Sequence, residues 1–442
     1  MRSHTAICSL YFLMVGTACV GPTGEQGLTP VVYEKGEQGE VASSGKTREA
    51  DPDATDVERL VADNSAFGLD FYRALRSTEQ GNLLFSPFSI SLALAMAYAG
   101  ARAETETQMA SALRFTLHQE RLHQAFNALD LLLAGKGGVT DDGRPWGFQL
   151  RLANSLWGQH DYTFLPEFLD LLAVNYGAGM QLVDFVSDPE AARIEINDWV
   201  AEHTGEKILD LIPEQAIDDK TRLVLVNAIY FKSAWATPFP EWATSQRDFH
   251  LLDGGAVRVP MMRQQAYFRH AAGEGFQTVQ LPYNELRTSM VLLVPDAGQL
   301  AAFEETLDEA RLAEILGALQ GTQLDLTLPR WRVTTSSVEL KGVLTALGMR
   351  DAFIDFVADF SGMDGRYSLK IEEVLHKAYI EVNEAGTEAA AATAVVTADS
   401  SCAGPDTVQL PVLTVDRPFI YLIIDDQTGT ILFAGRLVDP SA

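Results

Sequence analysis

The chain is poor in cysteine, in basic residues and in long apolar runs, and each shortage excludes a class of protein. Three cysteines occur in 442 residues, two of them near the N-terminus, so a fold held together by disulfides is excluded. Lysine and arginine total 33 against 60 acidic residues, and a formal net charge of −27 excludes the basic face that a nucleic-acid partner needs. After the N-terminus, no run reaches the roughly 18 apolar residues of a membrane span.

Motifs of familiar enzymes and metal sites are also missing. The eight histidines form no HExxH pair, and no Gly-x-Ser-x-Gly or strand-linked Gly-x-Gly-x-x-Gly motif occurs. We therefore expect no metal, no cofactor and no catalytic residues. A secreted hydrolase with a Ser/His/Asp site assembled from distant residues is the alternative of a different class.

The first 55 residues combine an export-type leader with a polar segment. A basic start and a short apolar run over residues 6–18 predict a signal peptide over residues 1–18. Residues 16–19 (GTAC) resemble a bacterial lipobox, although a glycine stands where leucine is usual, so Cys19 is the predicted lipidation site and membrane tether. Ordinary secretion is the alternative. Residues 19–55 are rich in Gly, Glu, Ser and Thr, which predicts a flexible tether and an extracytoplasmic location, secreted or anchored to an envelope membrane.

From residue 56 onward the hydrophobic pattern predicts one folded domain, residues 56–442. Phe67, Phe71 and Leu75 recur every four residues, which predicts a helix, and Ser86 caps a nearly all-apolar helix that belongs inside a core. Strands are predicted from apolar or alternating runs at 223–231, 290–294, 324–328 and, as a hairpin, 419–438. Helices dominate the first half and strands the second, which predicts an α+β fold.

The most informative segment is the alanine-rich stretch from Glu384 to Val396. If it entered a packed sheet as a strand, alternate side chains counted from Thr387 would face the core. All of these are small or β-branched and uncharged: Thr387, Ala389, Ala391, Thr393, Val395 and Thr397. The only charge after Thr387, Glu388, falls on the other face, no proline interrupts the stretch, and Gly386 supplies a pivot. An alanine-rich helix is the alternative.

This segment resembles the reactive-loop hinge of the serpins, a family of protease inhibitors, and the resemblance covers about residues 57–440. It implies the serpin fold, in which helices surround a large central mixed β-sheet with smaller sheets, and an exposed reactive loop over about 384–412. The motifs NLLFSPFSI at 82–90 and LVNAIYFK at 225–232 add to the likeness. The resemblance implies a hinge made of Glu384, Gly386, Thr387, Glu388, Ala389, Ala390, Ala391, Ala392 and Thr393. It also implies a sheet-opening cluster of Ser86, Ser89, Asn227, Trp235 and His376.

The resemblance further implies a suicide inhibitor rather than an enzyme. A target protease would cleave the loop as bait and be trapped as a covalent acyl-enzyme when the loop inserts into the sheet. The expected protein is a monomer whose partner is that protease. Residues 114–136 lack the clustered Lys and Arg of heparin-binding members, so no heparin is expected. A non-inhibitory serpin-fold module for binding or chaperone-like work is the alternative.

The residues of the bait loop narrow the class of protease that could be the target. Between Lys377 and Arg417 there is no other basic residue and, between Tyr379 and Phe419, no aromatic, which disfavours trypsin-like and chymotrypsin-like proteases. Counting forward from the hinge places Asp399 or Ser400 before the cut, with Ser401 and Cys402 as further candidates. Ser400 suits an elastase-like, subtilisin-like or papain-like protease, and Asp399 suits a caspase-like or granzyme-like one. The stretch after Gly404 is longer than in many serpins.

Overall fold

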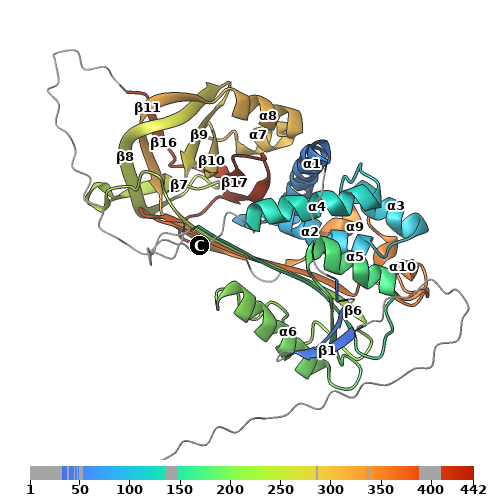
Figure 1. The fold of residues 1–442 in the computed structure, drawn as a ribbon. Coiled ribbons are helices and arrows are strands. Elements are labelled where there is room, and N and C mark those ends of the chain that lie inside the picture. Colours follow the sequence, from blue (N-terminus) through green and yellow to red (C-terminus); the bar gives the residue numbers. More distant parts are fainter. Residues whose placement is uncertain are drawn as a thin grey trace, which may run out of the picture.

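The computed structural model describes residues 32–36, 39–43, 45, 46, 48, 53–134, 148–284, 287–335, 338–387 and 410–442. Two β-sheets and a layer of helices make up this part of the chain (Figure 1). None of the helices in the described ranges is both long enough and apolar enough to cross a membrane.

Sheet A has nine strands within the described residues. Their order is β1 (Val32–Gly36), β2 (Gly39–Ser43), β5 (Met180–Val183), β4 (Gln149–Gln159), β6 (Leu223–Ala234), β15 (Gly386–Thr387), β14 (Glu373–Val382) and β12 (Trp331–Thr334), with β13 (Val338–Glu339) paired to β14. The sheet is mixed, because β4 pairs with β5 and β6 pairs with β14 in parallel, whereas β4 and β6 are antiparallel.

Sheet B also has nine strands in the part of the chain that is described. Their order is β16 (Val412–Thr414), β11 (Gln320–Pro329), β8 (Ala256–Gly273), β9 (Phe276–Pro282), β10 (Thr288–Pro295), β17 (Phe419–Asp425), β18 (Ile431–Leu437) and β3 (Leu83–Phe85), with β7 (Ser245–His250) paired to β8. The predicted C-terminal hairpin is therefore confirmed as β17 and β18. The strands predicted at 223–231, 290–294 and 324–328 are confirmed as β6, β10 and β11.

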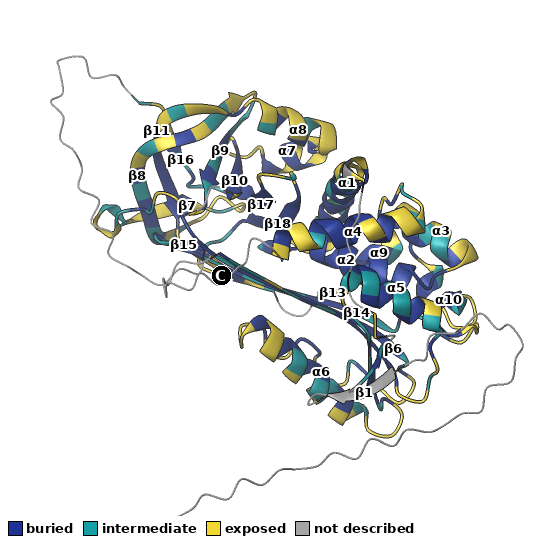
Figure 2. Ribbon diagram, in the orientation of Figure 1, coloured by how far each residue is buried: buried dark blue, intermediate teal, exposed yellow. Residues whose placement is uncertain are grey.

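Helices cover both faces of sheet A (Figure 1). One face carries α1 (Ala54–Thr78), α2 (Pro87–Tyr98), α3 (Ala103–Ala112), α4 (Gln119–Ala134), α5 (Pro166–Tyr176), α9 (Lys341–Ala346) and α10 (Ser361–Asp364), and the other carries α6 (Pro189–Thr204). Helices α7 (Leu300–Thr306) and α8 (Glu309–Gly317) lie beside sheet B, and η1 (Glu241–Ala243) and η3 (Asp351–Phe353) are single turns. Because both faces are covered, the central strand β6 is buried at all but one of its twelve positions (Figure 2).

The buried helix α2 forms as its sequence predicts. Ser86 is its N-cap, and its hydroxyl accepts a hydrogen bond of 3.1 Å from the N–H of Ser89. Pro87 fills the first turn, where its missing N–H costs nothing, and all twelve residues of the helix are buried. On the opposite face of sheet A, Ile196 and Val200 of α6 close a second apolar layer over the strands.

The structure corrects the expectation of a flexible tether over residues 19–55. Strands β1 and β2 form a hairpin, and β2 adds to the edge of sheet A beside β5, with Ala42 fully buried. Short segments with few large apolar residues suggest a tether, but backbone hydrogen bonds to an open sheet edge need no apolar side chains. Cys19 and the signal segment 1–18 lie outside the described residues.

One strand is more deeply buried than its alternation predicts. In β11 the leucines face the core, but the polar positions Asp325 and Thr327 are also buried. The carboxylate of Asp325 accepts hydrogen bonds of 2.8 Å from Arg263 and 2.9 Å from Gln265 on neighbouring β8. Side chains from the adjacent strand therefore cover the face that was expected to be wet.

Candidate functional site

The hinge strand β15 lies at one end of sheet A, between β14 and β6 (Figure 2). Thr387 pairs with Val382 of β14 on one side and with Ser233 of β6 on the other, antiparallel to both. Gly386 has a φ of 154°, and a Cβ there would lie 2.2 Å from the carbonyl oxygen of Ser233. Only glycine can pass this close to β6, which gives a physical reason for the pivot.

The side chain of Thr387 points into the core. It is fully buried, and its hydroxyl lies 2.6 Å from the hydroxyl of Tyr283. Burial raises the pKa of Tyr283 far above its usual range, so this phenol stays protonated and available for the hydrogen bond. Tyr283 in turn stacks on Trp235, with ring centroids 4.6 Å apart and an interplanar angle of 9°. The orientation of Thr387 fixes which face the later odd-numbered positions would take.

Glu384 holds the start of the hinge with its charge. Its carboxylate is buried, and it accepts hydrogen bonds from the guanidinium of Arg330 at 2.8 and 2.5 Å and from the hydroxyl of Thr244 at 2.5 Å. A buried carboxylate is stable only with such partners. The backbone is fixed as well, because the N–H of Phe239 donates to the carbonyl of Glu384 at 2.9 Å.

Directly below β15, strands β6 and β14 pair with each other. Their parallel register runs from Glu373↔Val224 to Tyr379↔Tyr230. We call this stretch the seam. At the hinge, the two residues of β15 separate β6 from β14, whereas along the seam these two strands pair directly. A parallel pair such as the seam is slightly less stable per residue than an antiparallel pair.

A buried polar cluster crosses the seam from the core side. The N–H of Ser86 donates to Nε2 of His376 at 3.3 Å, so the other ring nitrogen, Nδ1, carries the proton and donates to Oδ1 of Asn227. The side-chain amide of Asn227 donates to the hydroxyl of Ser89 at 2.6 Å. His376 lies on β14 and Asn227 on β6, so their hydrogen bond joins the two strands of the seam.

Asn154 of β4 also belongs to this cluster, although the sequence did not suggest it. Its Oδ1 accepts hydrogen bonds from Asn227 at 2.6 Å and from Ser89 at 3.0 Å. The adjacent polar residues Asn154 and Ser155, within the otherwise apolar part of β4, are the only signal that could have indicated it, because its partners lie on distant segments.

Trp235 does not lie in this cluster, which corrects its assignment there. Trp235 comes directly after the last residue of β6, beside the hinge. Its indole N–H donates to the carbonyl of Asn383 at 2.9 Å, and its backbone N–H donates to the carbonyl of Ala385 at 2.9 Å. Eight residues of extended strand, about 27 Å, separate it from Asn227. Trp235 therefore holds the hinge, and the polar cluster holds the seam.

Burial keeps His376 neutral. It lowers the pKa of His376 to about 3, well below the ordinary value of 6.5. The neutral ring is what the cluster requires, since a protonated Nε2 could no longer accept from Ser86. The seam is thus closed by a hydrogen-bond network that depends on one uncharged imidazole.

The far end of the seam is closed by Glu372, next to the first residue of β14. The N–H of Leu223 donates to its carboxylate at 3.1 Å, and its own N–H donates to the carbonyl of Leu223 at 3.1 Å. Burial raises the pKa of Glu372 to about 7. A pocket of about 450 Å³ opens at this end, lined in part by Lys220, Lys370 and Glu373.

The remaining predicted site residues belong to the segment between Thr387 and Leu410. The hinge positions Glu388 to Thr393 and the bait candidates Asp399, Ser400, Ser401 and Cys402 lie outside the described residues. The described chain resumes at Leu410, and Val412 already belongs to β16, so the loop is bounded by Thr387 and Leu410. Among the residues that are described, no group of three or more His, Cys, Asp and Glu is arranged to hold a metal ion.

Comparison with known proteins agrees with this geometry. A family profile described as serpin (serine protease inhibitor) matches residues 62–440. The chain is 37% identical over 401 residues to human Serpin B3 and 36% identical over 394 residues to human leukocyte elastase inhibitor, each covering 87% of this chain and all of the relative. The solved structure of human thyroxine-binding globulin complexed with thyroxine is 28% identical, with a TM-score of 0.76 over 87% of this chain and 99% of that one.

Proposed function

We propose that this chain, which belongs to the serpin (serine protease inhibitor) family, inhibits a protease by offering the loop after Thr387 as bait and inserting it into sheet A once it is cut. The position of β15 carries this proposal. The first residues of the loop already form a strand between β6 and β14, antiparallel to both, and the seam beyond them is the path along which that strand would extend.

The register of β15 gives a partner to every inserted residue. Since Thr387 pairs with Val382 and Ser233, each further residue pairs with the position one earlier on both neighbouring strands. Residue 393 would then lie between His376 and Asn227, and residue 397 between Glu372 and Leu223. The path thus ends where both strands begin, after ten residues or about 34 Å.

The side-chain pattern fits this path. Because Thr387 faces the core, the residues that would follow it inward are Ala389, Ala391, Thr393, Val395 and Thr397. Small side chains can enter a packed interior without displacing their neighbours. Thr393 would bring a hydroxyl to the level of the polar cluster, where the hydrogen bond between His376 and Asn227 has to break.

Backbone hydrogen bonding favours the inserted state. Insertion would break the one parallel ladder of the seam and form two antiparallel ladders over ten residues. If about ten hydrogen bonds are added at about 1 kcal/mol each, the gain is on the order of 10 kcal/mol. That free energy can drag an attached protease along the sheet, distort its site and prevent release of the acyl-enzyme. The chain acts once as a reactant and is not a catalyst.

The bait sequence favours a protease with a small specificity pocket. Ser400 before the cut suits an elastase-like or subtilisin-like serine protease or a papain-like cysteine protease, and one of the relatives is named leukocyte elastase inhibitor. Asp399 before the cut would instead need a pocket with a cationic partner. Both residues lie two or three positions beyond residue 397, so cleavage at either leaves a strand long enough to fill the seam.

The test is incubation with elastase, subtilisin, papain and an Asp-specific protease, followed by denaturing electrophoresis and mass spectrometry of the released C-terminal peptide. We expect a complex that resists SDS and a peptide that starts at Ser401 or, for Asp399, at Ser400. Cleavage by every protease without any stable complex would exclude inhibition. A peptide starting beyond Gly404 would show that the longer loop shifts the cut.

A ligand-binding module is the second candidate, supported by the similarity to thyroxine-binding globulin. Cleaved chain without a stable complex, and without gain in thermal stability, would favour it.

We also propose that residues 1–18 are removed on export and that Cys19 carries a lipid anchor. Mass spectrometry of the mature N-terminus tests this.

A further inference from the structure

The N-terminal strap, which we define as the described residues of 41–48, lies across the edge of sheet A. Its first part belongs to β2, which pairs with β5 through Val41↔Gln181 and Ala42↔Met180. The fit is tight, because a Cβ on Gly179 would come within 2.7 Å of the side chain of Val41 and 2.8 Å of the carbonyl of Ala42. The strap is therefore a built part of the sheet edge.

Beyond the strand, Arg48 connects the strap to helix α4. Its guanidinium donates to Oδ1 of Asn127 at 2.5 Å and to the carbonyl of Asn127 at 3.2 Å, and it pairs with the carboxylate of Asp130 at 2.8 Å. About a fifth of each charged side chain is exposed, so solvent screens this pair only in part. Because the guanidinium is planar and makes three contacts, it keeps Arg48 in one orientation against α4.

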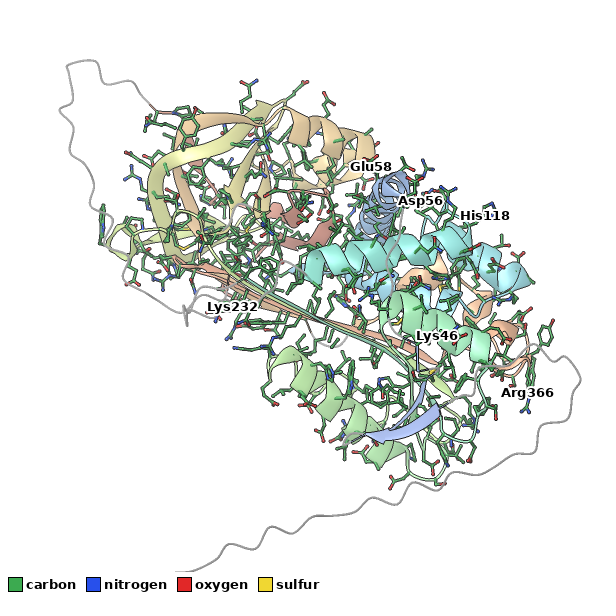
Figure 3. All side chains as sticks on the ribbon, in the orientation of Figure 1. Lys46, Asp56, Glu58, His118, Lys232 and Arg366 are labelled. Atoms are coloured by element: carbon green, nitrogen blue, oxygen red, sulfur yellow. The ribbon has the colours of Figure 1, made fainter. Side chains whose placement is uncertain are left out.

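Lys46 makes a different connection. Its ammonium pairs with Asp170 of helix α5 at 2.6 Å, and it lies by the sheet edge in Figure 3. Helix α5 leads within three residues into β5, the strand on which β2 is paired. The Lys46 pair therefore joins parts of the same side of the sheet.

Insertion of a strand requires the two sides of the seam to separate by about 4.8 Å. The side that contains β6 also contains β4, β5 and β2, so the strap would move with it. Helix α4 packs on α1, which contacts β18 and α9 outside that side of the sheet, and it also packs on α5, which leads into β5. The hydrogen bond between His123 of α4 and Tyr176 of α5, 2.6 Å long, crosses the same boundary. Arg48 thus adds a tie from the strap to α4, beside the packing and the hydrogen bond that join α4 to α5.

We propose that Arg48 is a latch that slows the opening of sheet A by tying its β2–β5 edge to helix α4. This inference rests on the proposed insertion of the loop. It gives the segment before the domain a regulatory role, because any processing that removes residues up to 48 would release the latch and shorten the lifetime of the uninserted state.

The test measures opening of the sheet without any protease. A fluorescent peptide with the sequence of residues 387–397 is added to the intact mature protein, and its first-order incorporation is followed by gel filtration. We expect Arg48→Ala to raise the rate about tenfold over the unmodified chain. Lys46→Ala is the matched control, since it removes an ion pair from the same strap, and its rate should stay within about twofold.

A charge exchange separates the latch from general destabilisation. In the double variant Arg48→Asp with Asp130→Arg the ion pair is restored in reverse, and the incorporation rate should return toward that of the unmodified chain. Equal rates in the unmodified chain and in Arg48→Ala would overturn the latch. An equal rise in Arg48→Ala and Lys46→Ala would also overturn it. No incorporation by any variant would instead overturn the insertion proposal on which the latch rests.

Discussion

Sheets A and B have the same number of described strands but differ in how their central strands pair. In sheet B the central strands β8, β9, β10, β17 and β18 pair antiparallel with their neighbours, and its parallel pair, β11 with β16, lies at the edge. In sheet A a parallel pair, β6 with β14, lies in the middle. A strand placed between two parallel strands can pair antiparallel with both, and β15 already shows this pairing between β14 and β6.

The groups that close the two sheets also differ. Sheet B is closed by its own hairpins, in which strands that are neighbours in the chain pair through short turns. The seam of sheet A joins residues that are 149 positions apart in the chain, and it is closed by the His376 cluster and by Glu372. Sheet B is thus held mainly by local pairing, whereas the middle of sheet A depends on pairing between distant segments and on a few buried polar groups.

Cleavage of the loop should have the largest effect. A cut between Val396 and Cys402 should raise the melting temperature by about 20 °C, because about ten added hydrogen bonds contribute on the order of 10 kcal/mol and a large domain gains about 2 °C per kcal/mol. Differential scanning calorimetry before and after verified cleavage measures this. Hydrogen exchange should slow in β6 and β14 and stay constant in β10 and β17. An unchanged melting curve would contradict the mechanism.

A charge at the level of the polar cluster should have the next largest effect. Thr393→Arg would require an arginine to enter beside His376 and Asn227, at a cost of several kcal/mol. The variant should be cut and released as a substrate, with little stable complex on a denaturing gel.

Thr387 is a poorer place for this test, because it is already buried before cleavage and an arginine there would also disturb the uncut protein. Thr393→Val is the control, since it keeps the shape and lacks the hydroxyl. Complex formation by Thr393→Arg at the level of the unmodified chain would show that insertion stops short of the cluster.

Loss of the imidazole at the seam should destabilise it by about 1–3 kcal/mol. His376→Ala leaves the buried amide of Asn227 and the N–H of Ser86 without their partner. Tyr421→Phe is a control, because Tyr421 is equally buried and its hydroxyl donates to the carbonyl of Leu83 at 2.8 Å, but it lies in β17 of sheet B, away from the seam. Both variants should melt earlier, but only His376→Ala should convert on warming to an inserted or polymeric form, which native gels detect. If both variants converted to the inserted or polymeric form, the polar cluster at the seam would have no special role in keeping sheet A closed.

Acid should loosen sheet A before sheet B, and this is the smallest predicted effect. The pKa of His376 is lowered to about 3 by burial, so the stability it contributes is present above about pH 6.5 and is lost as pH falls toward 3. Burial raises the pKa values of Glu372 and of its neighbour Glu373 to about 7, so the two carboxylates disfavour the closed seam above pH 7 and cease to do so as pH falls toward 4.5.

The two effects oppose each other down to about pH 4.5, below which that of His376 acts alone at about 1.4 kcal/mol per pH unit. Hydrogen exchange of β6 and β14 relative to β10 and β17 should therefore not accelerate above pH 4.5 and should accelerate below it. The double variant Glu372→Gln with Glu373→Gln should move the onset of acceleration toward pH 6.5. Equal acceleration in both sheets would attribute the acid response to the whole domain.

Much of the fold could be predicted from the sequence because local signals were strong. The spacing of Phe67, Phe71 and Leu75 and the cap at Ser86 predicted α1 and α2, and continuous apolar runs predicted β6 and β10. The β1–β2 hairpin was missed because an added edge strand is stabilised by backbone hydrogen bonds, which leave no hydrophobic pattern. The same holds for Asn154, whose partners lie on β6 and α2.

The sequence by itself determined what the loop can do. Its small, uncharged alternate residues after Thr387 are compatible with a strand in a packed interior, and composition shows that directly because side-chain size and charge are properties of each residue. Only the tertiary structure decided where such a strand would go. The seam, its polar cluster and the strap are made of pairs separated by tens to hundreds of residues, and pairing at that distance depends on how the whole chain packs.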